Sequence, residues 1–477
     1  MKSKFIGRCG ASAVALATTL AMAPNAWADA TTDVGSATVT LGGFLASEGL
    51  YRSRNEGADI GSTFSGIPFP STNTAHTSEL RFSARQSRLS ILAQGNADSN
   101  THLAFYGEFD FMAGPGSANS NESNSYSPRI RNVYGTVDWD AEGIELLAGQ
   151  NWSLLTLNSH GITPRNEVPP ATIDAQYSVG FNWARQPQIR VVKNFDHQIW
   201  LALSVENPQT TFAGGPGAGT IAGLNVVNSI VGSSEFDKAA NTLSLNHVPD
   251  VIGKVAWEPV IGDSQPLHIE AFGLYRSFYD RIEVTSATNA LGLPVGNNNS
   301  NVSGGGFGGS IAWSIIPKTL DLQITAMTGT GIGRYGSGQL PDVTIRPNGQ
   351  LAPIQETTAL FGATWHATPL LDIYAYAGQE AEQPKYFNVG TSHLGIGNPA
   401  VVTSGCATEL SSCSVNLQAE NQINGGFWWK IYQGKFGSFR YGMQYSYTHL
   451  DSFAGTGGIH APTDDSMVFT SIRYYPF

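Results

Sequence analysis

Phe439-Arg440-Tyr441-Gly442-Met443-Gln444-Tyr445-Ser446-Tyr447-Thr448 is the stretch that decides the fold of this chain. Aromatic or apolar residues occupy its odd positions, and polar residues or glycine occupy the even positions. Because successive side chains of a β-strand point to opposite faces of the sheet, this period of two predicts a strand with one apolar face and one polar face.

The flanking sequence repeats this pattern. A short break at 433–436 precedes the stretch, and a longer break separates it from a last strand that ends the chain on aromatic residues. Strand-like segments of this kind recur from about residue 37 onward. We predict sixteen of them, at 37–53, 79–94, 101–113, 128–139, 144–153, 178–193, 198–207, 245–258, 266–280, 302–316, 319–331, 354–368, 371–382, 418–432, 437–451 and 464–477.

The connections between these segments alternate in length. The long ones, which are rich in Gly, Ser, Asn and Pro, lie at 54–78, 114–127, 154–177, 208–244, 281–301, 332–353 and 383–417. Long loops at one end and tight turns at the other are typical of a transmembrane β-barrel, which must close because an unpaired strand edge is not tolerated in lipid. We therefore predict an all-β fold, a single closed antiparallel transmembrane barrel of about 16 strands, with long extracellular loops and short periplasmic turns.

The composition agrees with a lipid-facing barrel. Charged residues make up 13% of the chain, compared with about 25% in soluble domains. No segment after the N-terminal region has the roughly 20 uninterrupted apolar residues of a membrane-spanning helix. Aromatic residues recur near predicted strand ends, where an interfacial girdle would lie. These are Trp183, Trp257, Trp313, Trp365, Trp428, Trp429, Tyr474 and Tyr475.

The N-terminus has the features of a secretory signal peptide, with three basic residues followed by a short apolar run. Ala26-Trp27-Ala28 fits a cleavage site, so we expect residues 1–28 to be removed, with cleavage after Ala30 as the alternative. The domain at 31–477 is then the barrel. We expect the protein to be exported through the periplasm to the bacterial outer membrane.

The charge and the cysteines limit the choice of partners. The formal charge of −11 argues against nucleic acid as a partner. In an exported chain, Cys406 and Cys413 predict a local disulfide. We find no sequence motif for a metal site or a cofactor and expect neither.

Charged residues concentrate on the early strands. We predict that they line a constriction of the pore, where opposed charges would select solutes. They are Arg81, Arg85, Arg88, Glu108, Asp110, Arg129, Arg131, Arg165, Arg185 and Arg190. Arg88 shares a face with Arg81 only if a bulge near Gln86 shifts the phase of the strand. The alternative is that these charges pair with one another and brace the wall.

The segment 153–177, which contains Arg165, either folds into the lumen or remains an exposed extracellular loop. It also contains Ser159, His160 and Asp174, but no nucleophile motif surrounds them. Glu108 and Asp110 share a strand face, as paired glycosidase carboxylates could, but two neighbours on one wall are more typical of a pore lining. We therefore expect no catalytic residues and no enzymatic activity.

Several short segments resemble the DcaP-like family of trimeric, 16-stranded outer-membrane porins. They occur in the family's order at 84–88, 108–111, 129–135, 147–152, 185–188, 205–208, 249–251 and 329–335. The resemblance implies a homotrimer that takes up small, often anionic solutes through a basic eyelet lined by Arg81, Arg85, Arg88, Arg131 and Arg185. The chain departs from the family in lacking an N-terminal coiled-coil extension and in having longer loops with a cysteine pair.

We interpret the chain as a porin in outer-membrane lipid that allows passive diffusion of small hydrophilic solutes, including anions. The main alternative is a barrel whose long loops bind surfaces or mediate adhesion. A barrel hydrolase and a secreted β-sandwich are weaker alternatives.

Overall fold

The computed structural model of the chain describes residues 30–113, 121, 127–213, 224–227, 229–231, 242–259, 266–286, 294–389 and 392–476. The predicted signal peptide and Phe477 lie outside these ranges.

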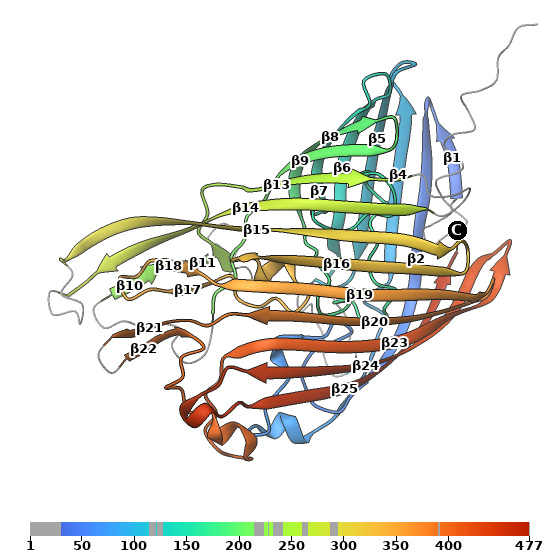
Figure 1. Cartoon of the computed structure of the whole chain (residues 1–477). Helices are drawn as coiled ribbons and strands as arrows, with labels where there is room; N and C mark the ends of the chain where they lie inside the picture. Colours follow the sequence, from blue (N-terminus) through green and yellow to red (C-terminus); the bar gives the residue numbers. More distant parts are fainter. Residues whose placement is uncertain are drawn as a thin grey trace, which may run out of the picture.

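Sixteen antiparallel strands form one closed barrel, which confirms the predicted fold class (Figure 1). Pairing of the first wall strand with the last, from Leu45 opposite Tyr474 to Arg52 opposite Met467, closes the ring. The wall consists, in order, of β2 (Ala37–Arg52), β3 (Glu79–Ser83) continued by β4 (Arg88–Asn96), β5 (Thr101–Asp110), β6 (Arg129–Trp139), β7 (Ile144–Trp152), β8 (Arg185–Phe195), β9 (Ile199–Glu206), β13 (Asp250–Trp257), β14 (Leu267–Val284), β15 (Gly296–Ile316), β16 (Leu320–Thr330), β19 (Gln355–Thr368), β20 (Leu371–Glu382), β23 (Leu417–Gly434), β24 (Gly437–Ser452) and β25 (Pro462–Tyr475).

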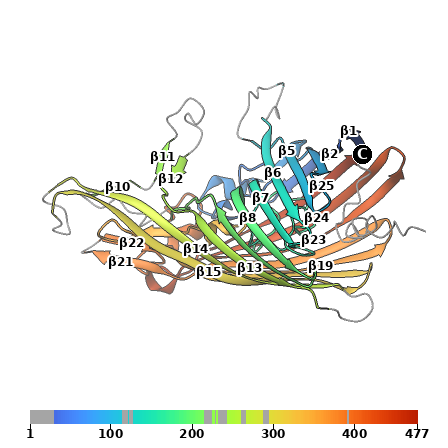
Figure 2. The ribbon, with the colours of Figure 1, turned by 90° about the horizontal axis from the view of Figure 1, so that it is seen from above.

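Smaller elements decorate this wall. β1 (Ala30–Val34) pairs with the start of β2, and β10 (Leu224–Val227) pairs with the far end of β14 in the long β14–β15 hairpin (Figures 1 and 2). The other short strands and the 3-10 helices lie in the connections: β11 (Ser229–Val231), β12 (Thr242–Ser244), β17 (Val343–Ile345), β18 (Leu351–Pro353), β21 (Lys385–Val389), β22 (Ser392–Ile396), η2 (Phe64–Gly66), η3 (Asn73–His76), η4 (Gly333–Tyr335), η5 (Ser404–Ala407) and η6 (Thr456–Gly458). Among the described residues, no helix is both long enough and apolar enough to cross a bilayer.

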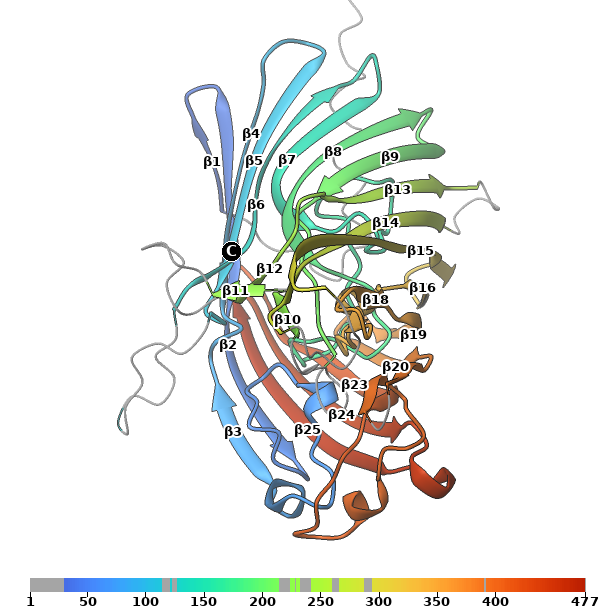
Figure 3. The same cartoon turned by 90° about the vertical axis from the view of Figure 1, so that its left-hand side faces the viewer.

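Long connections leave one end of the barrel and short turns leave the other, and we name these the long-loop end and the short-turn end. The long connections are L1 (53–78), L2 (111–128), L3 (153–184), L4 (207–249), L5 (285–295), L6 (331–354), L7 (383–416) and L8 (453–461). Figure 3, which faces the long-loop end, shows segments of chain inside the ring of strands. The interior is therefore partly filled by loops.

The two faces of the wall differ as the alternation predicts. Outward side chains are apolar and exposed, as Leu103, Phe105 and Leu203 illustrate. Inward positions carry buried polar groups such as Gln323 and Thr358. This arrangement suits a wall with lipid outside and a polar lumen inside.

The predicted aromatic girdle is only partly correct. Trp257, Trp365 and Trp429 are about half exposed near the short-turn end. Tyr475, by contrast, is buried, and Trp428 points inward, where its Nε1 donates to the Ala171 carbonyl of L3 at 2.8 Å. Trp183 likewise lies in L3. Adjacent residues of a strand must face opposite sides, so Trp428 and Trp429 cannot both belong to an outer girdle.

Some predicted strand boundaries are wrong. Residues 178–184, assigned to a strand, belong to L3, because their amides do not pair with a neighbouring wall strand. The Gly180 amide donates to Glu380 Oε1 at 2.7 Å, and the Trp183 amide donates to the Tyr335 carbonyl of L6 at 2.8 Å. β13 begins at Asp250 rather than at 245, and β15 begins at Gly296 rather than at 302.

The predicted bulge is confirmed. The pairing of β2 passes from Glu48 opposite Ser83 to Phe44 opposite Arg88, so four residues, 84–87, oppose three. The extra residue shifts the phase of the strand and turns Arg88 inward. Gly43 has φ +134°, and a β-carbon there would lie 2.2 Å from the Arg88 carbonyl oxygen, so the close strand approach beside the bulge requires glycine.

Candidate constriction site

L3 crosses the lumen. Near its start, the Leu154 amide donates to Glu206 Oε1 on β9 at 2.8 Å. In its middle, the Ala171 amide donates to the hydroxyl of Tyr376 on β20 at 3.0 Å. The loop then returns to β8. Contacts with such distant strands show that L3 folds into the barrel, which the sequence had left open.

A buried ion pair fixes the first half of L3. Lys254 Nζ on β13 lies 2.8 Å from Glu270 Oε2 on β14, and both side chains are fully buried. Lys254 also donates to the Thr156 carbonyl at 2.8 Å, while Glu270 accepts the Asn158 amide at 3.0 Å. The wall thus binds both donors and acceptors of the loop backbone.

Glu258, just beyond β13, continues this anchor toward the short-turn end. It accepts the Gly161 amide at 2.6 Å and pairs with His160 at 2.6 Å and His268 at 2.8 Å. Burial opposes ionisation of this carboxyl, but the hydrogen bonds from His160 and His268 outweigh it and lower the pKa of Glu258 to about 2. Glu258 is therefore an ionised carboxylate that holds the loop through the Gly161 amide and His160.

The predicted constriction residues divide into two groups, and the first surrounds two carboxylates. Arg131 binds both of them, with Nε 2.6 Å from Glu108 Oε1 and Nη1 3.0 Å from Asp110 Oδ2. Arg129 binds Asp110 through two hydrogen bonds of 3.0 and 2.7 Å. Arg131 also reaches the Tyr177 hydroxyl of L3 at 3.3 Å. This cluster joins the wall to the crossing loop.

Arg88 and Arg185 add positive charge to this group. Arg88 lies 3.6 Å from Glu108 and is partly exposed. The guanidinium of Arg185 lies 5.2 Å from the ring centroids of both Trp152 and Trp183, and its buried Nε and Nη1 have no hydrogen-bond partner among the described residues. Aromatic faces hold a guanidinium without neutralising it. Among the described residues, four arginines here face two carboxylates, so this part of the site carries net positive charge.

The second group of predicted residues serves other contacts. Arg81 pairs with Glu79 at 2.9 Å, near the long-loop end. Arg85 binds Asp59 of L1 at 2.7 Å and the Ala113 carbonyl of L2 at 2.9 Å. These two arginines hold loops and lie outside the group around Glu108 and Asp110.

Arg165 and Arg190 also lie apart from that group. Arg190 is buried and donates to the Trp152 carbonyl at 2.6 Å, where L3 begins. Arg165, within L3, donates to the Tyr134 hydroxyl at 3.3 Å. The sequence could not separate lining from bracing residues, because both kinds share the inward phase of the strands.

Sequence reasoning missed an acidic wall across the lumen. Its four members, all buried and inward-facing, are Glu356, Glu380, Glu382 and Glu420. L6 packs on them: the Gly338 amide donates to Glu380 at 3.0 Å, and a β-carbon on Gly338 would lie 2.0 Å from Glu420 Oε2. The sequence did contain a signal for this acidic wall, because all four glutamates have the inward phase and lie near the starts or ends of predicted strands.

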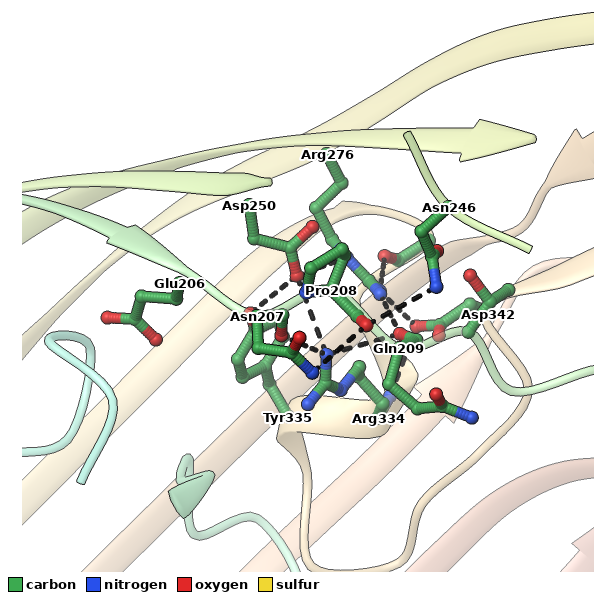
Figure 4. Close-up of polar contacts among 12 residues, drawn as sticks. Glu206, Asn207, Pro208, Gln209, Asn246, Asp250, Arg276, Arg334, Tyr335 and Asp342 are labelled. Atoms are coloured by element: carbon green, nitrogen blue, oxygen red, sulfur yellow. Dashed lines mark hydrogen bonds and ion pairs between the residues drawn. The ribbon is translucent and has the colours of Figure 1, made fainter. Parts of the chain in front are cut away.

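L6 is also pinned on its other side, as Figure 4 shows. Arg276 of β14 binds Asp250 at 3.1 Å and Asp342 of L6 at 2.6 Å. Tyr335 of η4 donates to Asp250 at 2.7 Å, and Arg334 donates to the Gln209 carbonyl of L4 at 3.2 Å. L4 and L6 are therefore tied to the wall and to each other.

Ser159, His160 and Asp174, the weak catalytic candidates of the sequence, do not form hydrogen bonds with one another among the described contacts. Ser159 donates to the Asn166 carbonyl at 3.2 Å, and His160 pairs with Glu258. Asp174 accepts the Ser62 amide of L1 at 3.1 Å, and burial raises the pKa of its carboxyl. Each of the three side chains is bound to a different group.

L7 carries a disulfide between Cys406 and Cys413. The Cys406 carbonyl accepts the Ser71 amide at 3.1 Å, and the Ser71 carbonyl accepts the Leu410 amide at 3.1 Å. The closed loop thus rests on L1 at the long-loop end.

No family model and no curated protein matches the chain. Among solved structures, the outer-membrane channel DcaP of Acinetobacter baumannii aligns over 93% of this chain and 99% of its own, with 16% identity and a TM-score of 0.62. The fold is that of the DcaP channel.

Other outer-membrane proteins align more loosely. The anion-selective porin of Comamonas acidovorans covers 92% of this chain and 99% of its own, with 11% identity and a TM-score of 0.45. OprB of Pseudomonas putida covers 91% and 94%, with 9% identity and a TM-score of 0.49. The DcaP match and the apolar exterior of the wall both show the fold of an outer-membrane β-barrel.

Proposed function

We propose that this protein is a passive porin that carries small hydrophilic anions across the outer membrane. One observation carries the proposal: among the residues that the structure describes, Arg88, Arg129, Arg131 and Arg185 surround two carboxylates at the place where L3 crosses the lumen. A ring of charge at a constriction selects solutes by the sign of their charge. The DcaP fold, which belongs to a channel, supports the same role.

The transport itself requires only a gradient. Hydrated solutes would pass the polar interior, while the apolar exterior holds the barrel in lipid. At the constriction the excess guanidinium charge attracts anions and repels cations, and Arg185 offers donors that no described residue occupies.

Swelling of protein-containing liposomes tests this role. We expect a small monocarboxylate to enter faster than a cationic amine of the same size, with a neutral solute between them. The double variant Arg88→Gln/Arg185→Gln should remove the preference, whereas Arg281→Gln, on the exposed β14–β15 hairpin, should keep it. Faster entry of the amine into wild-type liposomes would contradict the proposal.

The resemblance to DcaP-like porins also implies a homotrimer. Native mass spectrometry of detergent-extracted protein should give three times the mass of the mature chain. A monomer under conditions that preserve the folded barrel would contradict the trimer and leave the diffusion role in place.

A further inference from the structure

The tip of L6 and residues 178–184, which we name the return segment of L3, share one carboxylate of the acidic wall. Glu380 of β20 accepts the Gly338 amide of L6 at 3.0 Å and the Gly180 amide of L3 at 2.7 Å. The two loops also bind each other, because the Trp183 amide donates to the Tyr335 carbonyl at 2.8 Å. A change in the charge of this part of the wall therefore acts on both loops.

The backbone of L6 lies directly on the carboxylates. A β-carbon on Gly336 would lie 2.0 Å from Glu380 Oε2, and one on Gly338 would lie 2.0 Å from Glu420 Oε2. Glu380 is 1% exposed and Glu420 is 0% exposed. The docked loop thus excludes water from these two side chains, and it leaves no room for a hydrated cation between the backbone and the wall.

Several carboxylate oxygens of the wall have no partner. Both oxygens of Glu420, and one oxygen each of Glu356 and Glu382, are buried without a hydrogen-bond donor among the described residues. A buried carboxylate that is ionised and unpaired is costly, because it has lost its hydration and gained nothing in exchange. The docked arrangement therefore favours carboxyl groups that carry a proton.

Further carboxylates face the wall from two loops. Glu56 of L1 and Glu380 both act on Glu420 as like charges, and Asp342 of L6 acts in the same way on Glu382. Ionised groups of the same sign repel one another more strongly in a buried site than in water. Repulsion thus adds to burial in opposing ionisation of the whole wall.

The cations packed nearby are bound to other carboxylates. Arg276 of β14 acts on Glu356, but its ion pair is with Asp342, at 2.6 Å. Arg52 of β2 lies 3.5 Å from Glu56. Neither arginine forms an ion pair with the four glutamates of the wall. Protons, which need no room beneath the loop, are the positive charges that the docked wall can accept.

We infer that the acidic wall is a proton-dependent switch: protons bound to it keep the tip of L6 and the return segment of L3 docked, and their loss at higher pH releases both. Exposed glutamates lose their protons above about pH 4.3. The docked wall binds more protons than the released wall, so docking weakens as the pH rises above that value. The inference goes beyond the proposed function, because it concerns the position of the loops in the lumen and not the sign of the ions that pass.

The release would reach the constriction. Trp183, one of the two rings against Arg185, belongs to the return segment of L3. The base of L6 would stay in place, because Arg276 binds Asp342 on the other side of the loop (Figure 4). A rise in pH should therefore free the tip of L6 and the ring beside Arg185 without detaching the whole loop.

Hydrogen exchange of the full-length barrel in detergent tests the switch. After correction for the intrinsic pH dependence of exchange, we expect the Gly338 and Gly180 amides to exchange at least about tenfold faster at about pH 8 than at about pH 5. The reason is that each proton released changes the docking equilibrium by up to about tenfold per pH unit. Equal corrected rates in the wild type would overturn the inference.

The double variant Glu382→Gln/Glu420→Gln removes two of the charges and leaves Glu380 as the acceptor of both amides. We expect both amides to stay protected at about pH 8 in this variant. Glu142→Gln, at an exposed short turn, is the control and should keep the wild-type trend. A double variant that also keeps the full trend would show that the wall does not carry the switch.

A second variant separates the switch from misfolding. Gly338→Ala places a carbon atom against Glu420 and should give fast exchange of the Gly180 amide at both pH values, while the wall amides of β24 stay protected. A protected Gly180 amide in that variant would contradict the coupling of the two loops. None of these measurements depends on ion preference, so the switch and the anion-porin role can fail separately.

Discussion

The anchor of L3 allows a quantitative prediction. Lys254→Met removes the cation from a pair that is fully buried on both sides. It also removes the donor to the Thr156 carbonyl. Leaving one member of a buried ion pair uncompensated costs about 3–5 kcal/mol. His268, whose Nε2 lies 3.0 Å from Glu270 Oε1, keeps part of the compensation, so we expect a loss near the lower end of this range. Because Glu270 also accepts the Asn158 amide of L3, we expect this energy to appear as local detachment of the loop.

Hydrogen exchange of the L3 amides measures that detachment. A loss of about 3–5 kcal/mol corresponds to at least about a hundredfold faster exchange of the Asn158 amide. Lys254→Met/Glu270→Gln is the matched control, since it also removes the stranded charge, and its exchange should return most of the way to wild type. If the single and double variants exchange at the same rate, the ion pair does not hold the loop.

Three further predictions concern charge, pH and the disulfide. Arg185→Gln should shift the reversal potential in a salt gradient toward cation preference without changing barrel assembly, and an unchanged potential would remove Arg185 from the constriction. Burial raises the pKa of Glu56 in L1 to about 8 despite the nearby Arg52, so the folded loop binds the proton more tightly than the unfolded chain, and docking of L1 should weaken as pH rises from about 4.5 to about 8. Glu56→Gln should abolish that trend in hydrogen exchange of L1. Closing the short loop between Cys406 and Cys413 contributes about 2–3 kcal/mol, so the double serine variant should be cleaved faster in L7 by protease while its conductance stays at the wild-type value.

The barrel itself was predictable from sequence because its determinants are local. Alternation along single strands, as in β24, fixes which side chains face lipid and which face the lumen. The bulge between β3 and β4 was visible as a change of apolar phase within one segment. Closure then follows, since lipid tolerates no unpaired edge.

The interior of the barrel was less predictable, because the loops that fold into the lumen determine which side chains line it. The amides of Val179 and Gly180 bind wall side chains that are 243 and 200 residues away in sequence, and no periodic pattern reports such contacts. Consequently the sequence placed 178–184 in a strand. The same limit applies to the arginines. Arg85 and Arg131 both have the inward phase, but only the positions of L1 and L3 show that Arg85 binds L1 while Arg131 reaches Tyr177 of L3.

The reversal potential of the purified wild-type protein in a planar bilayer, under a salt gradient, tests the central claim most directly. Our account predicts channels that open in a lipid membrane and a potential whose sign reports preference for the anion. A potential of the opposite sign, or a folded barrel that conducts no ions, would contradict it.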